Sequence, residues 1–236
     1  MQENVILQGD NLEPDYKDDI LTQNARVCYP RENLSRYIAS NKAKIPKNVI
    51  LLCCDLYGVL PAVAKLNYNQ AVYYFLSGYT AAVPSTEFDV NNNNEIKTTF
   101  SACFGEAFFA RPAEIYAALL LKRLEQHQNK VYLVNTGWYG GSYGAGGQRF
   151  SIKTTRQIIH AIIADKIIAT NHLAELNLNI PQTLENIDSK LLNPIETWQN
   201  KQQYIQQRNK LIQEFHANFS KFNVAHDIII SGPKKS

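Results

Sequence analysis

The sequence has no strong imbalance of charge. Its 24 Lys and Arg residues and 21 Asp and Glu residues leave a formal net charge of +3 over 236 residues. A dedicated nucleic-acid-binding protein carries a dense basic patch or stripe, and no such patch stands out along this chain. The sequence therefore predicts that nucleic acid is not among the partners of the protein.

Cysteine is scarce, and its four positions form no pattern typical of a metal site. Cys28, Cys53, Cys54 and Cys103 include no C-x-x-C pair and no Cys/His ligand spacing. A disulfide scaffold is not expected in a chain of this length. Reduced thiols in the core of a cytosolic protein are the simplest interpretation.

Long hydrophobic runs are also missing. The longest lie near 48–54 and 115–121, far short of the ~20 residues that a membrane-spanning helix needs. The N-terminus, Met-Gln-Glu-Asn-Val, lacks the basic start and apolar stretch of a secretory signal. We therefore expect no membrane partner and a cytoplasmic location.

What the sequence does contain is a globular composition, with 45% apolar and 19% charged residues. The continuous apolar run at 49–54 predicts a strand buried on both faces, and 130–134 predicts another strand. Three- and four-residue apolar spacings predict helices over 112–126 and 154–164. The expected fold class is α/β, with a mixed sheet and flanking helices in a single partial domain over 1–236.

The C-terminal third is predicted to end in a long amphipathic helix over 194–222. Asn193 is a plausible N-cap, and Pro194 suits the first turn. Beyond it, the isoleucine run 228–230 is a candidate strand.

The densest candidate for function is the glycine-rich segment 136–149, which follows a strand and precedes a helix. It lacks the Gly-Lys-Ser/Thr ending of a Walker A loop and the spacing of G-x-G-x-x-G. Two interpretations stay open: a backbone cradle for an anion, or a flexible connection. Arg149 could stack on a base or bind a phosphate, or be an ordinary surface arginine. Asp55 could bind a metal, although isolated carboxylates are more often solvated or caps.

Several motifs in register carry a more specific signal. Segments 75–81, 99–105 and 133–138 strongly resemble ATP-dependent phosphoenolpyruvate carboxykinase, and shorter matches occur at 24–27, 57–61 and 149–153. They follow the order and the approximate spacing of that family, from about residue 20 to about residue 222. The resemblance implies the C-terminal nucleotide-binding domain of such an enzyme.

The resemblance implies a reaction. Oxaloacetate and ATP would give phosphoenolpyruvate, carbon dioxide and ADP, a step of gluconeogenesis, with a divalent metal (Mg or Mn) neutralising charge. By motif match, Arg26 corresponds to the arginine that reaches the substrate and the γ-phosphate. Arg149, Phe150 and Thr155 correspond to the adenine-binding end of ATP, and 86–99 to a mobile lid.

Departures from the family pattern are equally informative. Gln148 stands where a lysine is usual, and Phe150 where a smaller aliphatic residue is usual. The family's phosphate loop and metal ligands precede every motif found here, so the chain resembles only the C-terminal part. We therefore expect the chain alone to be inactive, whether it is a fragment, half of a split enzyme or the product of a decayed gene. A missing N-terminal half is the partner that this view implies. The alternative is a non-catalytic nucleotide- or partner-binding module that kept the fold.

Overall fold

The structure is a computed structural model that describes residues 1–16, 18, 20, 26–82 and 96–234. Its chain forms two compact units, Met1–Lys44 with Ala82–Lys97 and Ile45–Ala81 with Thr98–Ser236. This division is not visible in the sequence, from which one partial domain is expected. The first unit contains two small antiparallel strand pairs, β1 (Gln2–Glu3) with β4 (Arg26–Val27) and β2 (Ile6–Gln8) with β3 (Glu13–Asp15). It also contains a 3₁₀ helix over Arg31–Asn33.

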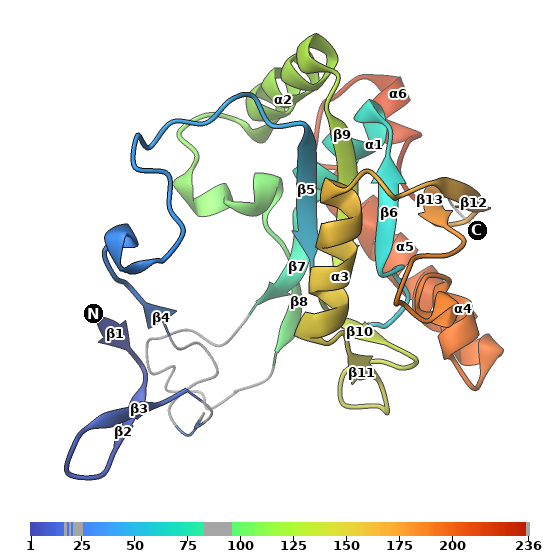
Figure 1. The fold of residues 1–236 in the computed structure, drawn as a ribbon. Helices are drawn as coiled ribbons and strands as arrows, with labels where there is room; N and C mark the ends of the chain where they lie inside the picture. The colour runs from blue at the N-terminus through green and yellow to red at the C-terminus, as the bar shows by residue number, and fades with distance from the viewer. Residues whose placement is uncertain (17, 19, 21–25, 83–95, 235–236) are drawn as a thin grey trace. The chain divides into compact units, whose positions relative to one another are not determined.

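The second unit is built on a five-stranded mixed sheet, labelled in Figure 1. Its strand order is β12-β13-β6-β9-β5, in which β5 and β9 are parallel and the other neighbours are antiparallel. The strands are β5 (Asn48–Cys53), β6 (Val63–Leu66), β9 (Lys130–Asn135), β12 (Ala169–Leu173) and β13 (Leu178–Pro181). Two shorter pairs are β7 (Tyr79–Ala82) with β8 (Lys97–Phe100), and β10 (Trp138–Tyr139) with β11 (Gln148–Arg149). The mixed α/β fold predicted from the sequence is confirmed.

Helices cover both faces of this sheet (Figure 1). Side chains along β9 alternate between the two cores: Val131 and Leu133 pack with one, and Tyr132 and Val134 with the other. The α-helices are α1 (Tyr68–Ser77), α2 (Ala113–His127), α3 (Ile152–Ile163), α4 (Pro194–Thr197), α5 (Lys201–Phe219) and α6 (His226–Ile229). Short 3₁₀ helices cover Ala102–Phe104, Glu106–Phe108 and Ser189–Leu191.

The predicted helices and strands are found with shifted ends, and three details differ. The range 194–222 holds two helices, α4 and α5, because the chain is extended at Trp198, whose indole donates to the carbonyl of Gly58 at 2.8 Å. The strand predicted at 228–230 is wrong: the segment lies in and just after α6, and only Ile228 is buried. In β5, Leu52 is 52% exposed, so this strand is not buried on both faces.

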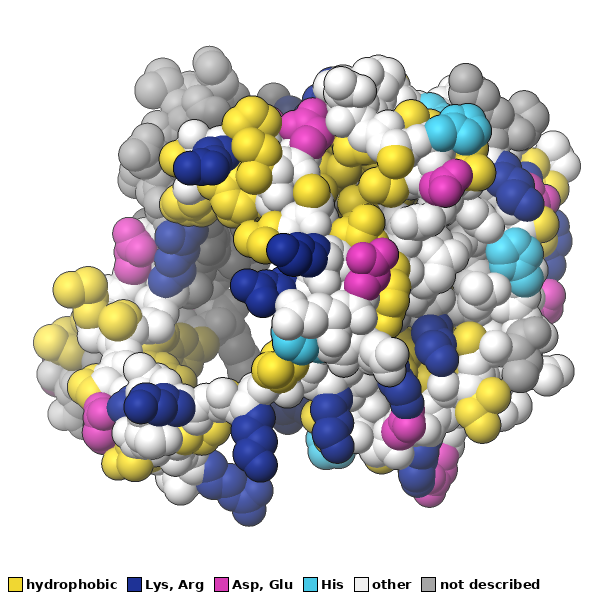
Figure 2. All heavy atoms as spheres, turned by 90° about the horizontal axis from the view of Figure 1, so that it is seen from above, with side chains coloured by type: hydrophobic (Ala, Val, Ile, Leu, Met, Phe, Trp, Pro, Cys, Tyr) yellow, Lys and Arg dark blue, Asp and Glu magenta, His cyan; other side chains and the backbone are white. Residues whose placement is uncertain are grey.

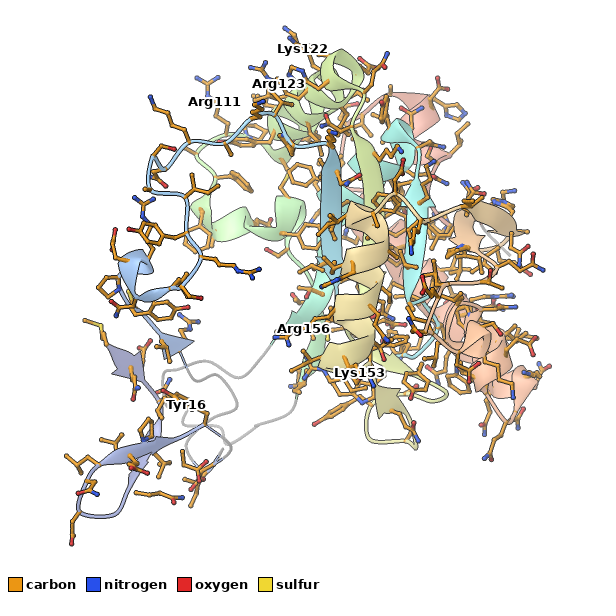
Figure 3. The ribbon with its side chains drawn as sticks, viewed as in Figure 1. Tyr16, Arg111, Lys122, Arg123, Lys153 and Arg156 are labelled. Atoms are coloured by element: carbon orange, nitrogen blue, oxygen red, sulfur yellow. The ribbon has the colours of Figure 1, made fainter. Side chains whose placement is uncertain are left out.

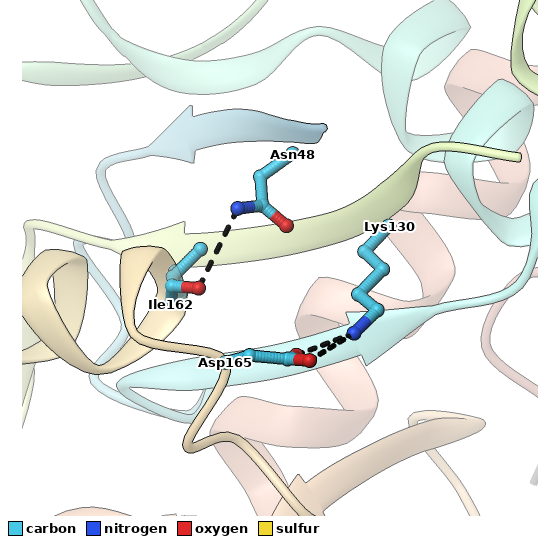
Figure 4. Close-up of polar contacts among 4 residues, drawn as sticks. All are labelled: Asn48, Lys130, Ile162 and Asp165. Atoms are coloured by element: carbon cyan, nitrogen blue, oxygen red, sulfur yellow. Dashed lines mark hydrogen bonds and ion pairs between the residues drawn. The ribbon is translucent and has the colours of Figure 1, made fainter. Parts of the chain in front are cut away.

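Polar contacts hold the C-terminal end of α3 against the start of the parallel strands (Figure 4). The side-chain amide of Asn48 donates to the carbonyl of Ile162 at 3.5 Å, and Lys130 forms an ion pair with Asp165. The Lys130 ammonium lowers the pKa of the Asp165 carboxyl. Both partners are largely exposed, so this ion pair orients the end of the helix more than it stabilises the fold.

The surface in Figure 2 carries Lys and Arg side chains interspersed with acidic and apolar ones, without one continuous basic field. Within the described ranges, no helix combines the length and the apolar character needed to cross a membrane.

Candidate functional site

The carboxyl ends of the parallel strands β5 and β9 meet at one edge of the sheet, and Asn135 joins them. This last residue of β9 is fully buried. Its Oδ1 accepts the N–H groups of Asp55 at 3.1 Å and Gly137 at 2.8 Å, and its Nδ2 donates to the carbonyl of Leu60 at 3.2 Å. The loops that follow the two strands are thereby fixed to each other, at the edge where open α/β sheets bind ligands.

Asp55 organises the loop that follows β5. Its carboxylate accepts the N–H groups of Tyr57 (2.8 Å), Val59 (2.7 Å) and Leu60 (2.7 Å), and the hydroxyl of Tyr79 (2.9 Å). Burial raises the pKa of this carboxyl, and the hydrogen bonds counter part of the rise. Asp55 is therefore neither solvated nor a helix cap: its carboxylate is buried, and both oxygens accept hydrogen bonds that hold the loop.

The glycine-rich segment 136–149 is a packed loop rather than a loose connection. The N–H of Gly140 donates to the hydroxyl of Thr197 at 3.0 Å, and the N–H of Tyr143 donates to the carbonyl of Leu56 at 2.8 Å. The N–H groups of Ala145 and Gly147 both donate to the carbonyl of Ser142. These four N–H groups already have protein acceptors, so they are not available to an anion.

Gly137 is one of the glycines in this arrangement with no room for a side chain. A Cβ built there would lie 2.3 Å from both the backbone N and O of Asp55. We expect Gly137→Ala to lower the free energy of unfolding by about 3 kcal/mol or more, measured by urea denaturation. Gly144→Ala is the matched control: Gly144 has a φ of +72° but no atom within 4 Å of its Cβ position, so the loss there is about 1 kcal/mol. Equal losses would contradict this account of the close approach.

Arg149 lies at the end of β11, beside the two strand ends. Its Nε donates to the carbonyl of Thr136 at 3.2 Å, and its guanidinium lies 5.2 Å from the centre of the Trp138 ring. The side chain is exposed, and its terminal nitrogens have no hydrogen-bond partner among the described residues. Its charge also opposes the rise that burial causes in the pKa of the Cys54 thiol. The Arg149 guanidinium is therefore held by the protein through its Nε, and its terminal nitrogens are open to a ligand.

Phe150 and Thr155 follow Arg149 along the chain, so all three residues of the predicted adenine site belong to the second unit. Phe150 is only 6% exposed, and its ring packs 4.9 Å from that of Tyr139. Thr155 is half-buried in the first turn of α3. Arg149 and Thr155 are therefore the more accessible members, with Phe150 behind them in the core.

The remaining predicted site elements belong to other parts of the chain. Arg26 is an exposed residue of β4, opposite Glu3 of β1, and is described within the first unit. Residues 86–95 of the predicted lid lie outside the described ranges, and the end of the lid segment is strand β8. The residues that the structure describes include no group of three or more His, Cys, Asp or Glu side chains that could hold a metal ion.

Sequence patterns missed the residues that build the loops of this site, namely Asn135, Tyr79 and Trp198. Only Asn135 gave a signal, because a polar residue that ends an apolar strand is a typical ligand or loop anchor. The partners of these side chains lie far away along the chain, as in the bond from Asp55 to Asn135, 80 residues apart. Such pairings follow from the topology and not from local spacing.

Comparisons with known proteins show the family to which the chain is similar. The family model described as "Phosphoenolpyruvate carboxykinase" matches residues 1–190. Three curated proteins named "Phosphoenolpyruvate carboxykinase (ATP)" each align with 98% of this chain and with 44% of their own length. The protein from Campylobacter jejuni (strain 81-176) is 47% identical to this chain, that from Sulfurimonas denitrificans is 42% identical, and that from Caldanaerobacter subterraneus is 39% identical. The chain thus spans less than half the length of these relatives.

Proposed function

This chain belongs to the phosphoenolpyruvate carboxykinase family, and from that premise we propose that it provides the adenine-binding end of the ATP site in an ATP-dependent carboxykinase. The reaction converts oxaloacetate and ATP into phosphoenolpyruvate, carbon dioxide and ADP. The observation that supports the proposal is the position of Arg149 beside the carboxyl end of β9, where its Nε donates to the carbonyl of Thr136. Thr155 lies in the first turn of the helix that follows, and both residues are inside the range that the family model matches.

The base end of the nucleotide suits the chemistry of these side chains. Adenine is an apolar plate with a polar edge, so the open side of the Arg149 guanidinium can stack on its face. The Thr155 hydroxyl can donate to or accept from the edge of the base. Phe150 supports this wall from the core and contributes less contact area than a fully exposed ring would.

The phosphate end of the nucleotide needs groups beyond those of the second unit. Decarboxylation of oxaloacetate leaves an enolate, whose oxygen forms a bond to the γ-phosphorus while ADP leaves. Catalysis of such a transfer is mostly positioning and neutralisation of charge. We assign to Arg26, by family resemblance, the contact with the substrate and the γ-phosphoryl oxygens, for which a guanidinium fork is well shaped.

The divalent metal of the family does not fit the residues described here. The chain's described ranges hold no cluster of three ligand-type side chains, and the buried Asp55 already accepts four hydrogen bonds. We therefore assign metal binding to the part of the relatives that this chain does not span.

Nucleotide binding by the isolated chain tests the adenine assignment. We expect titration calorimetry to give sub-millimolar affinity at best, with little preference between AMP and ATP, because the contacts are to the base. Each base contact is worth roughly 1–3 kcal/mol, which must offset the loss of translational and rotational freedom. Arg149→Ala should weaken binding about tenfold.

Arg123→Ala is the matched control, since Arg123 is an exposed arginine on α2 that hydrogen-bonds only locally, to Gln126. Its affinity should equal that of the wild type. Tight binding of ATP that survives Arg149→Ala would show that the nucleotide is placed wrongly.

A further inference from the structure

A groove of about 1100 Å³ runs along the outer side of α3, between this helix and the turn 183–186. We call it the α3 groove. It lies entirely within the second unit, and neither Arg149 nor Thr155 lines it. Nothing in the carboxykinase proposal gives it a role.

The hollow exists because the outer side of α3 carries small residues near its C-terminal end. Ala161 and Ala164 line the groove at helical spacing from Lys153 and Gln157, and Leu184 lines it from the facing turn. At the other end of the groove, Ile152 is 73% exposed. Apolar side chains therefore line parts of the groove, and polar or charged side chains, His160 and Gln157 among them, make up the rest of its lining.

The same groove has a cationic rim. Lys153 and Arg156 project from the N-terminal half of α3 (Figure 3) and have no ion pair or hydrogen bond from their side chains to any described residue. Lys166 lies near the C-terminal end and pairs with Glu185 on the facing turn at 2.8 Å, where both side chains are exposed. The cations on this rim therefore outnumber the acidic groups.

We propose that the α3 groove binds an acidic amphipathic peptide segment of a partner protein. Apolar side chains of the segment would lie over Ala161, Ala164 and Leu184, and its carboxylates would face Lys153 and Arg156, in a helix-in-groove arrangement. Charge complementarity of this kind selects the partner and speeds association. The proposal does not depend on the carboxykinase assignment.

Other occupants fit the groove less well. Its volume exceeds the ~300–1,000 Å³ of typical small-molecule pockets. A membrane surface is broad and would contact a protruding face rather than a hollow. The net charge of +3 is low for a nucleic-acid partner.

The test uses a fluorescein-labelled peptide in which glutamate and leucine alternate at helical spacing, and a control peptide with lysine in place of glutamate. Fluorescence anisotropy with the full chain should show saturable binding of the acidic peptide only, weaker at higher ionic strength. The double variant Lys153→Glu, Arg156→Glu should weaken binding at least tenfold. Ala164→Trp, which fills the hollow at an exposed position, should weaken it similarly.

The matched control is Lys122→Glu, Arg123→Glu, which makes the same change of net charge on the exposed side of α2 (Figure 3). It should bind as the wild type does, and thermal unfolding checks that each variant is folded. Three outcomes would overturn the proposal. The acidic peptide could show no saturable binding, the two double variants could lose affinity equally, or the lysine peptide could bind as tightly as the acidic one. Binding to vesicles containing phosphatidylserine without binding of the acidic peptide would also overturn it.

Discussion

The 236 residues expressed by themselves are expected to form no measurable phosphoenolpyruvate from oxaloacetate and ATP. The physical reason is that phosphoryl transfer depends on cations placed around the transferred group, and the described residues offer no cluster of metal ligands. The N–H groups donated within the glycine-rich loop are also unavailable to phosphates. A coupled assay for phosphoenolpyruvate, with Mg²⁺ and Mn²⁺ supplied, measures this directly.

The control for that assay is a full-length relative, such as the Campylobacter jejuni enzyme, measured under the same conditions. ATP-dependent product from this chain alone would contradict the expectation and would point to a second phosphate site among its own residues. The nucleotide titration described above stays informative in either case, because it reads binding of the base without turnover.

Asp55→Ala is expected to cause the largest loss of stability among single substitutions at the site, about 3–5 kcal/mol in the free energy of unfolding. Asp55 is fully buried and accepts four hydrogen bonds. Removing its carboxylate leaves three backbone N–H groups and the Tyr79 hydroxyl without their acceptor in the interior, which is a costly change. Urea denaturation monitored by tryptophan fluorescence measures the loss.

Two further variants separate this effect from a general loss of a carboxylate. Asp55→Asn keeps the shape and one acceptor oxygen, so its loss should be smaller than that of Asp55→Ala. Asp165→Ala removes an exposed carboxylate that pairs with Lys130 and should leave the stability close to that of the wild type. A loss for Asp165→Ala as large as that for Asp55→Ala would refute the role given to the buried carboxylate.

Local apolar periodicity predicted helices and strands best where one face of the element packs against the core. Isoleucines 158 and 162 are buried as the spacing in α3 predicts, whereas Ile163 next to them is 71% exposed. The strand predicted from the run of isoleucines at 228–230 is wrong, because β-branched residues favour strands only where a neighbouring strand is present. Here the local hydrogen bonds of α6 determine the structure instead.

The sheet order, the break at Trp198 and the division into two units could not be predicted, because each depends on contacts between distant parts of the chain. The site shows the same limit. Thr155 was assigned to the nucleotide only through the family resemblance, because a threonine near a helix start is common. Arg149 also stood out by its place at the end of the glycine-rich segment, but that pattern alone did not distinguish it from an ordinary surface arginine. The buried Asp55 gave no local sign that its oxygens would accept bonds from a loop and from Tyr79.

The most direct test of the central claim is reconstitution. This chain would be combined with a polypeptide corresponding to the N-terminal part of the Campylobacter jejuni relative that it does not span, and formation of phosphoenolpyruvate would be measured. The account predicts ATP-dependent activity only when both polypeptides are present, and a strong reduction with Arg149→Ala but not with Arg123→Ala. Absence of activity from a stable complex of the two would contradict the claim and favour a module that kept the fold without the reaction.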